Sequence, residues 1–194
     1  MQGPEDILKF WLDTAGEDKW YAVDDAFDQS IRDQFLETWQ AAKDGKFSLW
    51  LTYPSGALAY LNLTDQFPRN MFRGQAQAFS TDRAALAVAK SSIHKGWDMR
   101  IDPPARQFFY LPMMHSENLI DQDRCVRLMC ERMPKSESNM LHARAHRQVI
   151  RDFGRFPYRN EALSRNFTAV EKVYLENGGY GSTVRALQTE TEAA

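Results

Sequence analysis

The 194-residue chain carries 24 Lys and Arg against 26 Asp and Glu, and this near balance argues against a nucleic-acid partner. Its 12 Phe, 7 Tyr, 5 Trp and 8 Met can fill a large core without metal or disulfide support, so we expect a single helical domain over residues 1–183 and a frayed tail over 184–194. Cys125 and Cys130 lie five residues apart, which fits neither a CxxC pair nor a disulfide framework and favours a reducing cytoplasm.

The N-terminal residues are acidic and lack the apolar segment of a secretion signal. No uninterrupted stretch of about 18 apolar residues follows, so we expect a cytoplasmic protein that does not associate with membranes.

Apolar residues recur at helical spacing along almost the whole chain, and no segment alternates as a strand does. The sequence therefore predicts an all-α protein. The expected helices, in chain order, cover residues 4–15, 24–43, 55–67, 82–95, 104–115, 118–133, 138–154 and 168–177. Their short connections predict stacked antiparallel helical hairpins of a tetratricopeptide-like kind, although no 34-residue repeat can be laid over the sequence.

The third expected helix carries a carboxylate among apolar side chains. Asp65 falls between Leu58 and Leu61 on a helical wheel, where a lone charge is unfavourable, so it should have a cationic partner. Arg69 and Arg73 are the nearest candidates in sequence. Asp65 then has a catalytic role or forms a buried ion pair that orders the following loop.

Two phrases of the chain nearly repeat each other, at residues 66–70 and 155–160, and each ends in an Arg-Asn pair just after a Phe-Pro. Proline removes a backbone donor and biases the preceding residue away from helix, so each phrase should end a helix with its Phe in the core and its Arg-Asn pair in a loop. Two guanidinium groups in neighbouring loops would suit a carboxylate or phosphate. The alternative is two helix stops whose arginines bind orphan carbonyls.

Pro112 should kink or end the fifth expected helix, because its ring clashes with the carbonyl four residues earlier. Such a break would expose backbone groups beside Tyr110, His115 and Glu117 and could form the wall of a pocket. Core packing is the alternative use of the aromatic and Met side chains here. In the next helix Gln122 lies on an apolar arc, so it needs a hydrogen-bonding partner.

Two histidines lie on the apolar side of the seventh expected helix. His142 and His146 are four residues apart, so both imidazoles could meet one ion or one ligand. A metal site would need a third ligand, for which His115 or Glu117 would serve, and the HExxH glutamate is replaced by alanine. Hydrogen-bonded core histidines are the alternative, and our interpretation includes no metal and no cofactor.

Several phrases together carry a resemblance to a known family. They are Phe10-Trp11, Trp20-Tyr21, Phe27-Asp28, Asp65-Gln66-Phe67-Pro68-Arg69-Asn70, Phe72-Arg73-Gly74, Tyr110-Leu111-Pro112, His115-Ser116-Glu117, Asp121-Gln122, His146, Phe153-Gly154-Arg155-Phe156-Pro157 and Arg159-Asn160. The chain resembles, over about residues 7–176, the bacterial family called domain of unknown function 924. The resemblance implies an all-helical, tetratricopeptide-like fold and transfers no reaction.

The match departs near the C-terminus. The family commonly shows Leu-Gly-Arg and then Ser-Thr, whereas this chain has Leu163-Ser164-Arg165 and Phe167-Thr168. Arg165 is kept, but the geometry of this last loop need not follow the family.

Three interpretations follow. In the first, one polar pocket binds a small anionic molecule or a peptide carboxylate, and an enzymatic version would perform hydrolysis or a related group transfer. In the second, a non-enzymatic scaffold clamps an acidic or C-terminal peptide in a concave helical groove. In the third, the phrases form a buried polar network that fixes the fold.

The candidate residues share polar chemistry and a place in the phrases above. For the enzyme, His146 or His115 would be general base or acid, Asp65 or Glu117 would orient it, and arginines would hold the substrate. The candidate catalytic residues are His115, His146, Asp65 and Glu117, and the candidate ligand-binding residues are Arg69, Asn70, Arg73, Gln122, Arg155, Arg159 and Asn160.

Overall fold

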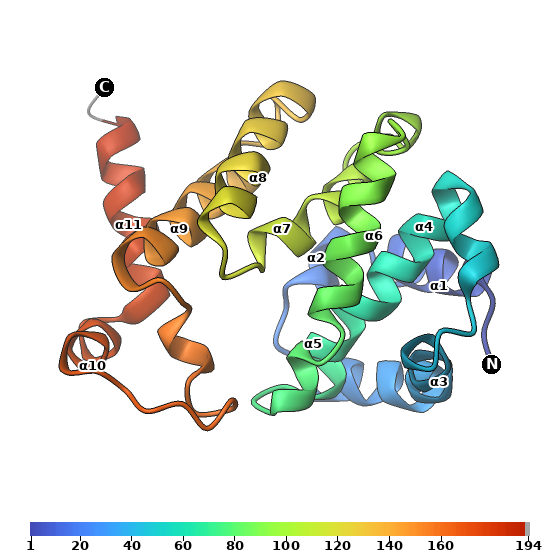
Figure 1. Cartoon of the computed structure of the whole chain (residues 1–194), viewed down its shortest axis with the longest axis horizontal. Coiled ribbons are helices and arrows are strands. Elements are labelled where there is room, and N and C mark those ends of the chain that lie inside the picture. Colours follow the sequence, from blue (N-terminus) through green and yellow to red (C-terminus); the bar gives the residue numbers. More distant parts are fainter. Residues whose placement is uncertain (193–194) are drawn as a thin grey trace. The chain divides into compact units, whose positions relative to one another are not determined.

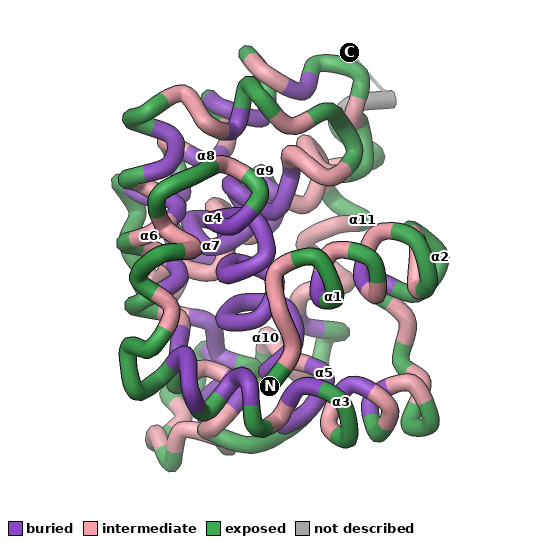
Figure 2. The backbone as a smooth tube through the Cα atoms, turned by 90° about the vertical axis from the view of Figure 1, so that its right-hand side faces the viewer, coloured by how far each residue is buried: buried purple, intermediate pink, exposed green. Residues whose placement is uncertain are grey.

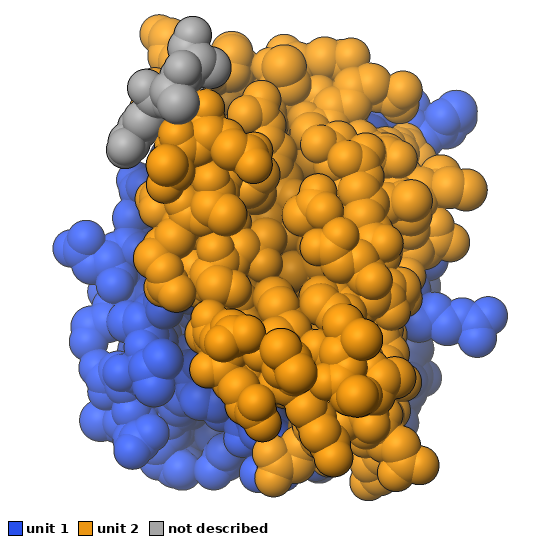
Figure 3. All heavy atoms as spheres, turned by 90° about the vertical axis from the view of Figure 1, so that its left-hand side faces the viewer, with its two compact units in different colours: residues 1–112 blue, residues 113–194 orange. Residues whose placement is uncertain are grey.

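The computed structural model describes residues 1–192, and every regular element within them is a helix (Figure 1). The prediction of an all-α protein is therefore confirmed for these residues. The chain divides into two compact units, residues 1–112 and 113–194 (Figure 3), and the division falls inside the short helix α7 (Leu111–Met114). The single domain and the tetratricopeptide-like stacking stay predictions. No helix of the described chain is long and apolar enough to cross a membrane.

The first unit is built mostly from short helices, and the longest of them is α3. In chain order they are α1 (Pro4–Leu8), the π-helix η1 (Lys9–Ala15), α2 (Glu17–Trp20), α3 (Asp25–Lys43), the 3-10 helix η2 (Ser48–Thr52), α4 (Pro54–Leu61), the π-helix η3 (Asn62–Gln66), α5 (Phe67–Met71), the 3-10 helix η4 (Ala76–Phe79), α6 (Asp82–His94), and the 3-10 helices η5 (Asp98–Arg100) and η6 (Ala105–Phe109). The expected helix at 104–115 is thus a 3-10 turn followed by α7, because Pro112 interrupts the regular α-helical pattern.

Aromatic rings fill the core of this unit. Phe67 meets the ring of Phe35 at 4.8 Å between centroids and that of Trp11 at 5.3 Å, and both Phe67 and Trp11 are completely buried. α4 crosses this core and is buried from Gly56 to Leu61, as its purple colour in Figure 2 shows. A Cβ at Gly56 would lie 2.4 Å from the Trp50 carbonyl oxygen, so only glycine fits there.

The prediction that the first Phe-Pro phrase ends a helix is wrong. Residues Phe67–Met71 form α5, directly after the π-helix Asn62–Gln66, so Arg69 and Asn70 are helical. Pro68 is tolerated because the preceding π-helix widens the turn, and the carbonyl of Thr64, four residues earlier, accepts from the Thr81 hydroxyl at 2.6 Å instead of from a backbone N–H. The predicted burial of Phe67 is confirmed, since it is completely buried.

The second unit contains α8 (Leu119–Arg132), α9 (Glu137–Phe153), the 3-10 helix η7 (Pro157–Arg159), α10 (Ala169–Glu176) and α11 (Gly179–Glu192). α9 ends where Gly154 adopts the left-handed conformation with φ 70°. Pro157 then begins a 3-10 turn that includes Arg159, while Phe156 is completely buried as predicted.

Helix α11 was not predicted. It covers residues 184–192 of the segment that we expected to fray, and residues 193–194 of that segment lie outside the described residues. The Tyr180 ring packs on His142 and His146 of α9, and this contact stabilises the helix.

Candidate functional site

The candidate residues fall on both units. Asp65, Arg69, Asn70 and Arg73 lie in the first unit, whereas His115, Glu117, Gln122, His146, Arg155, Arg159 and Asn160 lie in the second. That all of them form one pocket stays a prediction. Each set has its own geometry.

In the first unit, the structure pairs Asp65 with Arg69. The Asp65 side chain is 1% exposed, and its Oδ1 lies 3.3 Å from Nη1 of Arg69, which also lies 3.0 Å from Oδ1 of Asp82 on α6. The side-chain amide of Gln66 donates to the same Asp65 carboxylate. Arg69 thus links η3 to α6, which favours the structural alternative for this pair.

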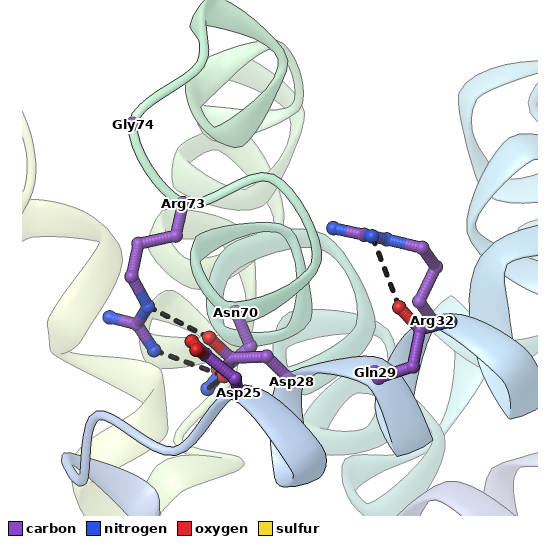
Figure 4. A pocket seen from close by; sticks show the side chains of 7 residues that line it. All are labelled: Asp25, Asp28, Gln29, Arg32, Asn70, Arg73 and Gly74. Atoms are coloured by element: carbon purple, nitrogen blue, oxygen red, sulfur yellow. Dashed lines mark hydrogen bonds and ion pairs between the residues drawn. The ribbon is translucent and has the colours of Figure 1, made fainter.

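Asn70 and Arg73 both face the carboxylate of Asp28 on α3 (Figure 4). Arg73 donates from Nε to Oδ2 at 2.8 Å and from Nη2 to Oδ1 at 3.0 Å, and Asn70 donates to Oδ1 at 2.7 Å. The Asp28 side chain is only 10% exposed. Asp28 belongs to a phrase that carries the family resemblance, but its place in the site does not follow from the sequence, because the pairing spans more than 40 residues.

These three residues line a surface pocket of about 410 Å³. Its other lining residues are Asp25, Gln29, Arg32 and Gly74. Asp25, Asp28, Asn70 and Arg73 gather on one side of the pocket, with Gln29 and Arg32 on the other (Figure 4).

In the second unit, Glu117 is an anchor for two loops. Its Oε1 accepts from the backbone N–H of Phe156 and from Nη1 of Arg165, and its Oε2 accepts from Nη2 of Arg165, all at 2.9 Å. Partial burial acts to raise the pKa of Glu117, but these hydrogen bonds and the charges of Arg165 and Arg159 hold it below the usual range. Glu117 is therefore an ionised carboxylate that fixes the chain around Phe156. Arg165 was noted in the sequence only as a residue that matches the family.

Arg155 holds Glu171 of α10. Its Nε and Nη2 donate to the two carboxylate oxygens at 2.6 and 2.8 Å, and Glu171 is 2% exposed. Glu171 also completes the capping box of α10 by accepting from the backbone N–H of Thr168 at 2.7 Å. The hydrogen bond from Arg155 is the largest cause that lowers the pKa of Glu171 to about 2.

Two further candidates are completely buried. Gln122 donates to the carbonyl oxygens of Met114 at 2.6 Å and Ser116 at 2.7 Å, which supplies the partner that the sequence required. The backbone carbonyl of Asn160 accepts from the N–H of Arg165 at 2.8 Å. Gln122 therefore fixes the backbone at Met114 and Ser116, and Asn160 fixes it at Arg165.

His146 is held by two groups at one ring nitrogen. Its Nδ1 lies 2.8 Å from the backbone carbonyl of His142 and 2.9 Å from the hydroxyl of Tyr180. A carbonyl oxygen can only accept, so Nδ1 of His146 carries the proton and Nε2 carries the lone pair. The Tyr180 hydroxyl lies 2.7 Å from Nδ1 of His142, to which it can donate. Tyr180 was missed because the residues that carry the resemblance end before α11.

Positive and aromatic groups surround the His146 ring. The ring centroid lies 5.4 Å from that of Phe156 and 6.2 Å from that of His115. The Arg159 guanidinium, on a residue only 5% exposed, lies 4.5 Å from the Phe156 ring centroid. Burial, and then the nearby charges of His115, Arg159 and His142, lower the pKa of His146 to about 3 against the smaller opposing effect of the His142 carbonyl. At neutral pH this imidazole is uncharged.

Metal ligation was one alternative for the histidines. Among residues 1–192, no group of three or more His, Cys, Asp or Glu side chains is arranged to hold a metal ion. Nδ1 of His142 and Nδ1 of His146 both contact the Tyr180 hydroxyl, at 2.7 and 2.9 Å.

The depressed pKa of His146 predicts a loss of stability in mild acid. Its folded-state pKa of about 3 lies below the unfolded value of about 6.5, so the unfolded chain binds more protons between these values. The free energy of unfolding should therefore fall as the pH drops below about 6.5. His142, whose pKa is also lowered by burial, contributes in the same direction.

Thermal melts between pH 7.5 and 5 measure this effect above the range in which carboxylates titrate. His146→Asn should flatten the dependence of Tm on pH, whereas His94→Asn, at an exposed position on α6, should leave it as in the wild type. An equal dependence of Tm on pH in the wild type and in His146→Asn would contradict the lowered pKa of His146.

Comparisons with known proteins agree with this fold. A family model described as bacterial protein of unknown function (DUF924) matches residues 7–179. The solved structure of the protein of unknown function ATU0120 from Agrobacterium tumefaciens is similar with a TM-score of 0.85 and 40% sequence identity, over 90% of this chain and 97% of that chain. No curated protein matches the chain. Because the family model covers most of the sequence, the chain belongs to the bacterial DUF924 family.

Proposed function

We propose that the second unit binds a small anionic molecule, with a carboxylate or phosphate group, beside His146 and Arg159. The observation that carries this proposal is the fixed orientation of His146, whose Nδ1 is bound to the His142 carbonyl and the Tyr180 hydroxyl. Nε2 is then the nitrogen that remains to meet a ligand. Arg159 adds a guanidinium close enough to influence the pKa of His146, and such a group suits carboxylate and phosphate oxygens.

Ester hydrolysis is the reaction that this pair would support. Nε2 of a neutral His146 accepts one proton from a water molecule, and the water oxygen forms a bond to the acyl carbon or phosphorus. The bond to the leaving group breaks, and that group departs with the electron pair and takes up the proton from His146, which becomes neutral again. Arg159 stabilises the negative charge that develops on the attacked group.

The other predicted arginines contribute less to anion binding in this proposal. Arg69, Arg73 and Arg155 each face a carboxylate of the chain itself. The alternative peptide scaffold would require several of them to leave these carboxylates, which would expose buried charges at a high cost. We place this activity in the cytoplasm, which the free thiols of Cys125 and Cys130 suit.

An NMR titration tests the binding step directly. Acetate and inorganic phosphate should each be added to the wild-type protein while the imidazole resonances of His146 and His94 are followed. We expect the His146 resonances to shift in a saturable manner and those of His94 to stay in place. No saturable shift of His146 with either anion would overturn the proposal.

A charge substitution then tests the role of Arg159. Arg159→Gln should remove the anion-induced shift, whereas Arg144→Gln, at an exposed position on α9, should keep it. Circular dichroism should establish that both variants are folded. Retained binding in folded Arg159→Gln would assign the anion to another group. Hydrolysis of p-nitrophenyl acetate and p-nitrophenyl phosphate by the wild type then decides between an enzyme and a binding protein.

A further inference from the structure

The surface pocket of the first unit lies far in sequence from His146 and has a different composition. One wall is a single face of α3, because Asp25, Asp28, Gln29 and Arg32 follow the spacing that aligns side chains on a helix. The remaining lining residues, Asn70, Arg73 and Gly74, lie at the end of α5 and in the turn after it (Figure 4). The volume of about 410 Å³ is in the range of small-molecule sites.

The charges of this pocket balance. Asp28 and Arg73 neutralise each other through two hydrogen bonds, and Asn70 holds the same carboxylate, so this part of the wall is already fixed. Asp25 and Arg32 remain as one negative and one positive group at different positions along α3. A simple anion would be attracted to Arg32 but repelled by Asp25. A ligand that carries both charges would satisfy both residues.

Arg32 keeps donors for such a ligand. It donates from Nη2 to the carbonyl oxygen of Met71 and from Nη1 to the side chain of Gln29 at 3.3 Å. A guanidinium has five N–H groups, so further donors are present in an orientation set by these two bonds. Asp25 is exposed in the first turn of α3, where its carboxylate can accept from an ammonium group.

The separation of the two charges selects the length of the ligand. The α-carbons of Asp25 and Arg32 are seven positions apart, which corresponds to about 10.5 Å along the helix axis. One extended residue spans at most about 3.6 Å, so a free amino acid is too short to reach both groups. Three extended residues span about 11 Å, and the long Arg32 side chain shortens the distance that must be covered.

We propose that this pocket binds a short zwitterionic peptide of two or three residues, with its amino terminus at Asp25 and its carboxylate at Arg32. The Asp28–Arg73 pair and Asn70 form the fixed wall against which the peptide backbone lies. This site is independent of His146 and does not rest on the anion site of the second unit.

Backbone-only peptides give the sharpest test, because they vary in length and end charge alone. NMR titrations of the wild type should compare glycine, diglycine, triglycine, N-acetyl-diglycine and diglycine amide. We expect diglycine or triglycine to shift the backbone resonances of residues 25–32, with a Kd at least about tenfold lower than that of glycine or of either capped peptide. Equal affinity for the free and capped peptides, or no shift with any of them, would overturn the proposal.

Charge variants test which pocket residue binds each end of the peptide. Asp25→Asn should raise the Kd of the uncapped peptide at least about tenfold, and Arg32→Gln should do the same. Asp13→Asn and Arg83→Gln, at exposed positions of the same unit, should leave it unchanged. Arg32→Gln also removes the bond to Met71, so the exposed Asp25→Asn is the deciding variant, and unchanged binding in it would overturn the proposal.

Discussion

Replacing His146 with asparagine should lower kcat for hydrolysis of a p-nitrophenyl ester by about 10²-fold, which is the low end of the usual contribution of a general base, because a pKa of about 3 makes its imidazole a weak proton acceptor. Asparagine places an amide near the position of Nδ1, so it can still donate to the His142 carbonyl, which lies 2.8 Å from that nitrogen in the wild type. It has no atom at the position of Nε2. The substitution therefore removes the proposed base while it keeps the hydrogen bond that anchors the ring.

The comparison needs both kinetics and stability. Initial rates with p-nitrophenyl acetate and p-nitrophenyl phosphate should be measured for the wild type, His146→Asn and His94→Asn, together with the melting temperature of each. His94→Asn should retain the wild-type rate, because His94 is exposed on α6. A rate within about threefold of the wild type in folded His146→Asn would rule out His146 as the base.

The largest loss of stability is expected for Phe67→Ala, at about 3–5 kcal/mol. Phe67 is completely buried and its ring contacts those of Phe10, Trp11 and Phe35 at centroid distances of 6.1, 5.3 and 4.8 Å. Alanine would leave a cavity that these large rings cannot close, so both transfer energy and packing contacts are lost.

Urea unfolding followed by tryptophan fluorescence measures this change, because Trp11 reports on the same cluster. Leu49→Ala is the control: Leu49 is 77% exposed, and its removal should change the free energy of unfolding by no more than about 0.5 kcal/mol. A loss below about 1 kcal/mol for Phe67→Ala would show that the cluster repacks around the cavity.

Local patterns were sufficient for the fold class and for much of the core. The 3.6-residue periodicity predicted the long helices, and the burial of Phe67 and Phe156 followed from their positions beside proline. The same local rule misplaced Arg69 and Asn70, because a π-helix before Pro68 lets the chain continue as α5. Helix α11 was missed because Tyr180 packs on histidines more than 30 residues earlier.

The polar residues were recognised more readily than their partners. The sequence singled out Arg73, Glu117 and Arg155 as site residues, and the structure gives them Asp28, Arg165 and Glu171. The smallest of these separations is 16 residues. Periodicity places a side chain on one face of its own helix, whereas the choice of a distant partner depends on how the helices pack. Arg32 lay outside the predicted set for the same reason.

The π-helix at Asn62–Gln66 sets how far α5 is rotated about the helix axis relative to α4. An α-helix turns by about 100° per residue and the wider π-helix by only about 80°, so rewinding these same residues with α-helical geometry would rotate α5 by roughly 90–100° relative to α4. Arg69 would then turn away from Asp82, and Asn70 would turn away from Asp28. The π-helix thus fixes the rotation between α4 and α5, and both polar clusters of the first unit depend on that rotation.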